Sequence, residues 1–401
     1  MSITDVWTSK SRIFIDETKL MLEYIPSFLP HRRQQLEILA SMFKLVLEKP
    51  GASCQKVILI GPVGTGKTVV CKYFGKNISD YAKQMDVNLL YIHVNCHKNR
   101  TLYAVMKYVS DKLKIPTPTR GFSTQELFRI IWSTLENKNS YLILTLDEID
   151  YLISRSGGEV LYDIARVSDE FIEEEIRINF ILVTRDVTSL VMLDESIKSS
   201  LLHNIINFNP YTAKEIYDIL KARVTVEKAM REEAVSEDVY EIIGEIVGID
   251  KGGKGDARLA LEILWKAGKI AERQGLNHVT AEHVRIAYEN IAPTLTKSSI
   301  DRLKKHEKIV LLAIAKRLQE TGKTYISMGE VVNEYQLLCE IFNERPRKHT
   351  KIWEYIRTLS KLGIIVARLS GPGIRGKTTL VSIPAVSLEK LSKKLYRLLK
   401  E

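Results

Sequence analysis

The feature that most constrains this chain is a glycine-rich loop placed between a strand-like run and a helix-permissive run. Residues 56–60 read K-V-I-L-I, residues 61–68 read G-P-V-G-T-G-K-T, and the next glycine is Gly75. Glycines let such a loop curl so that its backbone N–H groups face phosphate oxygens, while the lysine and threonine reach the terminal phosphates and a magnesium ion. The pattern predicts a nucleoside-triphosphate cradle whose contact residues are Gly61, Pro62, Val63, Gly64, Thr65, Gly66, Lys67, Thr68 and Val69.

The same motif occurs again near the end of the chain, at residues 371–378, which read G-P-G-I-R-G-K-T. The residues after it form a β-branched run, T-L-V-S-I, closed by Pro384, and too few residues remain for the partner strand of a nucleotide fold. We therefore expect a strand–turn–strand hairpin here rather than a second nucleotide site.

An acidic pair at the end of a second apolar run supplies the other groups that nucleotide chemistry needs. Residues 142–150 read L-I-L-T-L-D-E-I-D. Asp147 would orient Mg²⁺ together with Thr68, and Glu148 would polarise the water that attacks the terminal phosphate. An ordinary strand with an acidic turn is the alternative, but its place downstream of the first loop favours ATP or GTP binding. The predicted catalytic residues are Lys67, Asp147 and Glu148, and the predicted metal ligands are Thr68 and Asp147.

Length and composition are those of a protein with two or three separate cores. The chain has 401 residues, of which 45% are hydrophobic and 27% charged. It contains no apolar run long enough for a spanning helix and no signal-peptide pattern, so we expect no membrane partner. The four cysteines, Cys54, Cys71, Cys96 and Cys339, lack the paired spacing of a zinc site or a disulfide framework. A reduced, cytoplasmic compartment is the expectation.

Basic charge is concentrated in the last quarter of the chain. Residues 297–401 carry 22 Lys+Arg against 10 Asp+Glu, a net charge of +12, whereas the whole chain has a net charge of +10. A basic module appended to a near-neutral nucleotide-binding body favours a nucleic-acid partner. A merely solvated basic surface is the alternative that charge alone leaves open.

The pattern within this basic region predicts a winged helix. We expect helices over residues 300–319, from residue 327 onward, and over 348–362, followed by strands over 364–369 and 378–383. The third helix would enter a major groove, and the hairpin would reach the backbone or the adjacent minor groove. The predicted DNA contacts in this region are Lys348, Lys351, Arg357, Arg368, Arg375 and Lys377.

The region between these modules, residues 212–292, has helical patterns and no strand signals. A glycine turn at residues 252–255 precedes a helix whose first turn presents Arg258. That side chain could reach back to a bound nucleotide if the helical region packs over the glycine-rich loop. An exposed arginine in a surface ion pair is the alternative.

Taken together, these segments resemble one family, the archaeal replication initiators. These are AAA+ ATPases related to the eukaryotic origin recognition complex and its cell-division-cycle loader. The resemblance covers residues 12–401. The segments that carry it are Ile13-Phe14, Tyr24-Ile25-Pro26, Leu29-Pro30-His31-Arg32, the glycine-rich loop, Leu146-Asp147-Glu148-Ile149-Asp150, Leu161-Tyr162, Leu193-Asp194, Ser199-Ser200-Leu201, Gly255-Asp256-Ala257-Arg258 and the terminal winged helix.

The resemblance implies an α/β AAA+ core with a parallel sheet, an α-helical lid and a winged-helix domain, which we place at residues 1–211, 212–295 and 296–401. It implies control by ATP or ADP with Mg²⁺, and double-stranded origin DNA as the partner, with paralogous initiators and the replicative helicase as further partners at the nucleoid. Further nucleotide contacts would be Pro30, His31, Arg32, Tyr211 and Arg258. An insertion in the ATPase domain would add DNA contacts at Lys114, Arg120 and Gly121.

The chain departs from the family pattern at two places. The sensor strand is followed by Thr184-Arg185-Asp186 instead of Ser-Asn-Asp, so a cation replaces a water-positioning amide. Ser196 stands where the family has an intersubunit arginine. Because arginine fingers contribute several orders of magnitude in rate, we expect slow hydrolysis that self-assembly does not stimulate, and a divergent paralogue with a regulatory or accessory role at the origin.

Two other classes of protein remain as alternatives at this point. A branch-migration motor or a signal-transducing ATPase also combines a phosphate loop with a winged helix, but a motor needs fast hydrolysis and an intact arginine finger. A structural nucleotide binder without DNA function is the third reading. Charge reversal at Arg375 and Lys377 would discriminate, because loss of phosphate contacts weakens DNA binding and its salt dependence.

Overall fold

The structure, a computed structural model, describes residues 11–116, 121–156, 160–162, 164, 175–185, 201, 203–291, 300–369 and 378–400. The chain forms two compact units. One comprises residues 25–210, and the other joins the residues up to 24 with those from 211 onward. Each unit has its own buried apolar clusters.

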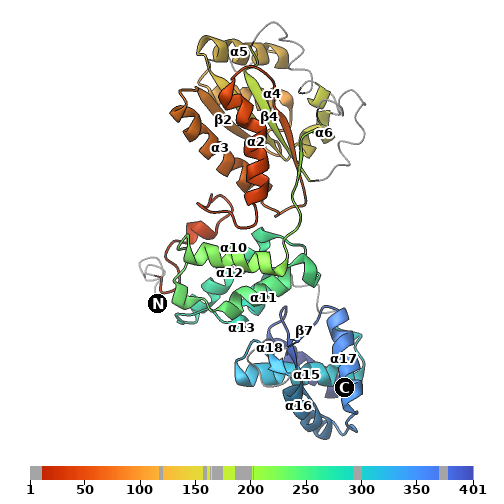
Figure 1. The fold of residues 1–401 in the computed structure, drawn as a ribbon. Coiled ribbons are helices and arrows are strands. Elements are labelled where there is room, and N and C mark those ends of the chain that lie inside the picture. Colours follow the sequence, from red (N-terminus) through yellow and green to blue (C-terminus); the bar gives the residue numbers. More distant parts are fainter. Residues whose placement is uncertain are drawn as a thin grey trace. The chain divides into compact units, whose positions relative to one another are not determined.

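A parallel five-stranded sheet forms the centre of the first unit (Figure 1). Its described strands lie in the order β2-β3-β4-β1-β5. Their bounds are β1 Lys56–Ile60, β2 Leu89–Asn95, β3 Tyr141–Asp147, β4 Ile178–Thr184 and β5 Ile205–Asn207. Because the strands are parallel, their carboxyl ends meet at one edge, where β2 and β3 place Asn95 directly opposite Asp147.

Helices cover both faces of this sheet (Figure 1). Side chains alternate along each strand, so β1 sends Val57 and Leu59 into one apolar cluster and Ile58 and Ile60 into the other. The helices α2 and α3 complete the first cluster, whereas α4, α5 and α6 complete the second. Their bounds are α2 Arg33–Glu48, α3 Lys67–Gln84, α4 Leu102–Lys112, α5 Thr124–Asn137 and α6 Asp150–Ser156.

The second unit begins with a helical part that contains no strand element among its described residues. Its helices are α10 Ala213–Thr225, α11 Glu237–Val247, α12 Ala257–Arg273 and α13 Ala281–Ile291. The segment before residue 25, which we assigned to the AAA+ domain from sequence, pairs with this part: Phe14 forms an isolated bridge with Met230, and its ring lies against Gly268. The proposed domain limits stay a prediction.

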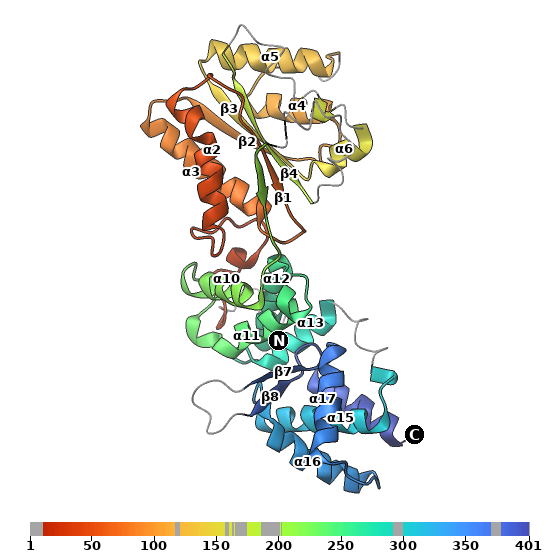
Figure 2. The ribbon, with the colours of Figure 1, turned by 45° about the vertical axis from the view of Figure 1, so that its right-hand side comes forward.

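The carboxyl-terminal part has the helices and hairpin of a winged helix (Figure 2). Its elements are α15 Lys305–Thr321, β6 Ile326–Ser327, α16 Met328–Ile341, α17 His349–Lys361, β7 Val366–Leu369, β8 Thr379–Ser382 and α18 Leu388–Lys400. The sheet order is β6-β8-β7 with antiparallel pairing. The expected α/β core, helical lid and winged helix are therefore confirmed as the fold class.

Local signals explain several boundaries of this part. Ser327 and Glu330 form a capping box at the start of α16, where the sequence predicts that this helix begins. Gly363 ends the third helix with a φ of 68°, a conformation that glycine adopts without a steric penalty. The strands on either side of the second glycine-rich motif pair as an antiparallel hairpin, as expected, although residues 371–377 lie outside the described residues.

Two elements of this part were not anticipated. The helix α18 packs on α15 through Leu391, Leu395 and Leu399, and β6 adds a third strand to the hairpin. Leu362, the last residue of the third helix that we predicted over 348–362, is half exposed, because the helix ends one residue before it.

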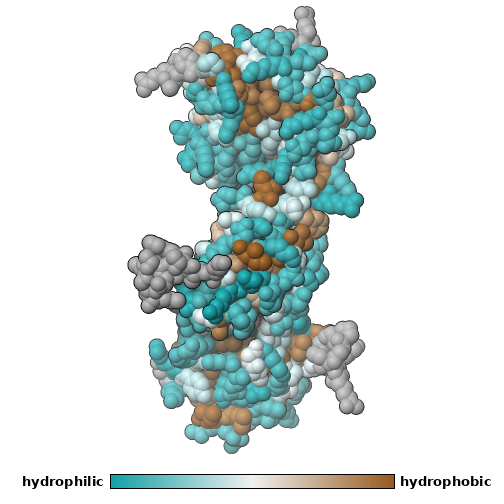
Figure 3. All heavy atoms as spheres, turned by 90° about the vertical axis from the view of Figure 1, so that its left-hand side faces the viewer, coloured by the Kyte–Doolittle hydropathy of each residue, from teal (hydrophilic) through white to brown (hydrophobic). Residues whose placement is uncertain are grey.

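Among the residues that the structure describes, no helix is long and apolar enough to cross a membrane. The face of the molecule drawn in Figure 3 is mostly hydrophilic, and its apolar patches are small and separate.

Candidate functional site

The glycine-rich loop connects β1 to α3 and has the shape of a phosphate cradle. Gly66 lies at the amino end of α3 with a φ of 90°, which favours glycine. Gly61 is required for a different reason, because a Cβ at this position would lie 2.2 Å from the backbone oxygen of Phe208. Both glycines therefore keep the loop tight at the amino end of a helix, where backbone N–H groups can bind an anion.

The side chain of Lys67 folds back onto the start of this loop. Its ammonium group donates to the carbonyl oxygens of Gly61 and Pro62, the latter at 2.7 Å, and its side chain is buried. The cation is therefore fixed within the loop that is predicted to receive phosphates.

Asp147 lies at the carboxyl end of β3, beside the first turn of α3. Its Oδ2 accepts from the Thr68 hydroxyl at 2.8 Å and lies 3.2 Å from Nε2 of His93. Burial by itself would raise the pKa of Asp147, but the hydrogen bonds from His93 and Thr68 outweigh it and hold the pKa below its ordinary value of 3.8. A buried carboxylate beside a threonine hydroxyl fits Mg²⁺, which prefers oxygen ligands and retains waters and phosphate oxygens.

Glu148 follows Asp147 with a φ of 57°, in the left-handed region that a non-glycine residue seldom adopts. Its Oε2 accepts from the Asn95 amide at 3.1 Å, and its Oε1 accepts from the Arg185 guanidinium at 3.2 Å. The predicted base and the unexpected cation of the sensor strand are therefore in contact.

Arg32 supports the glycine-rich loop from behind. Its side chain is only 4% exposed and lies over the Phe208 ring. The guanidinium donates to the carbonyl oxygens of Thr65 and Asn209, each at 2.9 Å. Arg32 therefore contacts the glycine-rich loop through a hydrogen bond to its backbone. Direct contact of Pro30, His31 or Arg32 with a nucleotide stays a prediction.

Tyr211 and Arg258, the predicted nucleotide contacts beyond the sheet, belong to the other unit. The Tyr211 backbone N–H donates to the carbonyl of Gly255 at 3.1 Å. Asp256 caps α12 by accepting from the backbone N–H of Arg258 at 2.8 Å, and Arg258 is exposed in the first turn of that helix. The helix start is as expected, whereas the role of both side chains toward a nucleotide stays a prediction.

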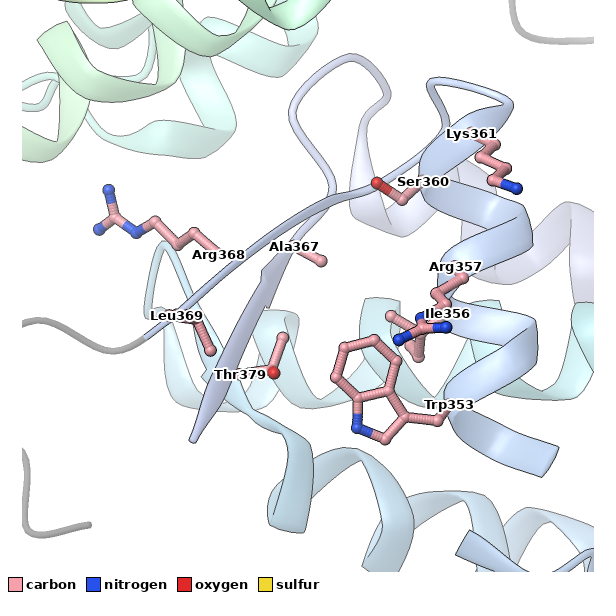
Figure 4. Close-up of a pocket in the computed structure, with 9 residues that line it drawn as sticks. All are labelled: Trp353, Ile356, Arg357, Ser360, Lys361, Ala367, Arg368, Leu369 and Thr379. Atoms are coloured by element: carbon pink, nitrogen blue, oxygen red, sulfur yellow. The ribbon is translucent and has the colours of Figure 1, made fainter. Parts of the chain in front are cut away.

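The predicted DNA-reading helix is α17, and three of its predicted contacts are exposed: Lys348, Lys351 and Arg357. Between α17 and the β7–β8 hairpin lies a pocket of about 270 Å³, drawn in Figure 4. Its lining residues are Trp353, Ile356, Arg357, Ser360, Lys361, Ala367, Arg368, Leu369 and Thr379. The guanidinium of Arg357 lies over the Trp353 indole, 4.8 Å from its centroid, so part of the arginine's freedom is already lost.

Arg368, on the hairpin, makes contacts within its own unit. Its Nη2 lies 3.0 Å from Oε2 of Glu241 on α11, and its guanidinium lies over the Tyr325 ring at 3.9 Å. A DNA contact by Arg368 would have to compete with this ion pair. Arg120, Arg375, Lys377 and Ser196 lie outside the described residues, and Lys114 and Gly121 flank the undescribed segment 117–120 between α4 and α5.

Sequence reasoning missed His93 and Asn95, which contact the acidic pair from β2. The available signal was the alternation of polar residues at the end of the strand H-V-N, because carboxyl ends of parallel strands meet at one edge. Glu241 and Tyr325 were also missed, and they have no comparable local signal because their partner, Arg368, is distant in sequence. Trp353 was missed as well, although its spacing of four residues from Arg357 on one helix was a local signal.

Comparison with known proteins gives matches along almost the whole chain. Residues 51–187 match the AAA domain, residues 217–289 match the Cdc6 AAA+ ATPase-type lid domain, and residues 298–392 match the CDC6 C-terminal winged helix domain. The chain is 43% identical over 383 residues to the ORC1-type DNA replication protein 2 of Sulfurisphaera tokodaii. This alignment covers 95% of this chain and 92% of that protein.

Two similar solved structures hold ligands. The ORC1 protein of Aeropyrum pernix in complex with DNA is 30% identical, with a TM-score of 0.62 and coverage of 97% of this chain and 100% of that one. The ORC2 protein of Aeropyrum pernix, solved as ADPNP–ADP complexes, is 26% identical, with a TM-score of 0.65 and coverage of 97% and 98%.

Proposed function

This chain belongs to the archaeal ORC1/Cdc6-type family of AAA+ replication initiators, and we propose on that premise that it binds double-stranded origin DNA under the control of ATP. The matched domains follow one another along the chain in the family's order. Membership of this family leaves no support for the alternative of a branch-migration motor.

For nucleotide binding, we assign the phosphates to the glycine-rich loop and to Lys67. Thr68 and Asp147 would hold Mg²⁺, which when bound would neutralise charge on the phosphates. Glu148 would accept the proton of the attacking water. These roles are supported by the tight loop, the buried ionised carboxylate of Asp147 and its hydrogen bond to Thr68.

Hydrolysis should be slow, and we propose that it acts as a switch rather than as a motor. The amide expected after the sensor strand is replaced by Arg185, and the position of the intersubunit arginine holds Ser196. Turnover that rises to ordinary ATPase rates at higher protein concentration or on adding DNA would contradict this proposal.

The observation that carries the DNA-binding proposal is the set of exposed cations on α17 beside the hairpin. Lys351 and Arg357 project from α17, Lys348 is the cap residue at its amino end, and the Trp353 indole holds the Arg357 guanidinium. A helix with these cations fits a major groove, where lysines meet phosphates and an arginine can bind a base edge.

The test is a titration of fluorescent duplex DNA with a Lys351→Glu/Arg357→Glu variant across several salt concentrations. Loss of two cationic contacts should weaken binding and reduce the slope of log affinity against log salt by about two. The matched control is Lys390→Glu/Lys393→Glu, an equal charge change on α18. Unchanged binding by the first variant, or an equal loss in the control, would refute α17 as the DNA-binding helix.

A further inference from the structure

Arg185 follows directly after the last residue of β4, and its guanidinium donates a hydrogen bond to Glu148, the predicted base. We propose that Arg185 is a positioning residue that restrains Glu148 and thereby slows ATP hydrolysis in this chain. The inference rests on the proposed function, because it takes Glu148 as the group that accepts the proton of water.

The backbone of Arg185 is fixed by the residue that opens α6. Asp150 accepts from the Arg185 backbone N–H at 3.1 Å through Oδ2, and from the Thr184 hydroxyl through Oδ1. Both contacts connect the end of β4 to the turn that follows β3. The start of the Arg185 side chain is therefore held close to the acidic pair.

The guanidinium is braced by an aromatic ring. It lies over the Tyr151 ring at 5.3 Å from the centroid, and its Nη2 donates to the Tyr151 hydroxyl at 3.2 Å. Tyr151 in turn packs edge-on against His97, with centroids 4.5 Å apart. These contacts restrict the positions that a long, partly exposed side chain can take.

From that position Arg185 occupies one oxygen of Glu148 while Asn95 occupies the other. Nη2 of Arg185 lies 3.2 Å from Oε1, and the Asn95 amide lies 3.1 Å from Oε2. The backbone of Glu148 adds to the constraint, because its φ of 57° fixes the direction in which the side chain leaves the chain. The carboxylate is therefore held from both sides.

A carboxylate that acts as a base must offer an oxygen to water at hydrogen-bond distance. A charged donor is a stronger competitor for that oxygen than a neutral amide. The side chains of Arg185 and Glu148 are 44% and 28% exposed, so solvent weakens the pair. A restraint of this kind slows proton acceptance without abolishing it, in agreement with a slow switch.

The principal test is single-turnover hydrolysis of ATP by excess protein carrying Arg185→Met, which removes the cation without supplying an amide that could position water. We expect the rate to rise about two- to fivefold, the population shift that release of a partly exposed ion pair can give. Tyr151→Phe, which removes one anchor of the guanidinium, should give a smaller rise. Arg129→Met, a cation lost from the exposed face of α5, should leave the rate unchanged. An unchanged or lower rate for Arg185→Met would overturn the inference.

Glu148→Gln separates this inference from the function on which it rests. If Glu148→Gln hydrolyses ATP as fast as the natural protein, the assignment of the base is wrong. If Glu148→Gln is slow, the Arg185→Met/Glu148→Gln double variant should be equally slow, because there is no carboxylate left to release. A double variant that is faster than Glu148→Gln would overturn the restraint.

A second readout needs neither nucleotide nor activity. Carbodiimide and glycinamide label accessible carboxylates, and peptide mass spectrometry reports each site. Labelling of Glu148 in the nucleotide-free protein should rise about twofold or more in Arg185→Met, whereas labelling of Glu136, exposed on α5, should stay constant. Equal labelling of Glu148 in both proteins would contradict the proposed ion pair.

Discussion

Arg32→Ala should destabilise the nucleotide-binding unit, because the guanidinium is a buried support of the glycine-rich loop. Its side chain is 4% exposed and donates to the carbonyl oxygens of Thr65 and Asn209, each at 2.9 Å. Hydrogen bonds from a charged group are worth about 1.5–3 kcal/mol each. Taking the lower value for both bonds, since water can reach part of the loop, gives a loss of about 3 kcal/mol.

A loss of that size in a unit of this length lowers the melting temperature by about 6–12 °C. Nucleotide affinity should fall about tenfold as well, because binding must then order a loop residue that Arg32 ordered before. Thermal melting of the nucleotide-free chain measures the first effect, and anisotropy of a fluorescent ADP measures the second.

Arg33→Ala is the matched control for this prediction. Arg33 is the next residue and pairs with Glu37, but both side chains are well exposed, so its loss should move the melting temperature by less than about 2 °C. The result that would refute the reasoning is an Arg32→Ala variant that loses nucleotide affinity and keeps the melting temperature. That outcome would place Arg32 directly on the nucleotide.

Three further predictions concern the cradle and the second unit. Asp147 has a lowered pKa in the folded chain, so its contribution to stability is present above the ordinary pKa of 3.8 and disappears as the pH falls through the lowered pKa. The Asp147→Asn variant lacks this contribution at every pH. Its melting temperature should therefore fall less steeply with decreasing pH in the acid range than that of the natural protein. Gly61→Ala should unfold or strongly destabilise the first unit, because its Cβ would lie 2.2 Å from a backbone oxygen. Gly329→Ala is the control: its Cβ would have no neighbour closer than 4.0 Å, so chemical denaturation should show no change or a stabilisation of about 0.5 kcal/mol. Glu241→Gln releases Arg368 from an ion pair in which the two side chains are about a third exposed, so affinity for duplex DNA should rise about twofold in an anisotropy titration; a weaker complex would mean that the pair holds the hairpin in its DNA-binding position.

The elements with local signals could be predicted from the sequence. The strand–loop–helix around Lys67 and the capping box at Ser327 depend on neighbours within a few residues, and both are found. The helix α18 was not predicted, although Leu388, Leu391, Leu395 and Leu399 form an equally clear apolar stripe along it.

The contacts that were missed join residues far apart in the chain. Asn95 reaches Glu148 only because β2 and β3 pair in one particular register, which two short apolar runs cannot fix. The hydrogen bonds from Arg32 to the carbonyls of Thr65 and Asn209 also join distant residues, and its direct contact with a nucleotide stays a prediction. The ion pair of Arg368 with Glu241 depends on how α11 packs against the hairpin.

The central claim is sequence-dependent binding of duplex DNA by the winged helix. Its most direct test is to incubate the ATP-bound protein with a random duplex pool at near-physiological salt and to sequence the DNA that it retains, because phosphate attraction alone is then largely screened. The account predicts one short recurrent sequence, which the Lys351→Glu/Arg357→Glu variant fails to enrich. Retention of DNA without any sequence preference, or the same enrichment by the variant, would contradict it.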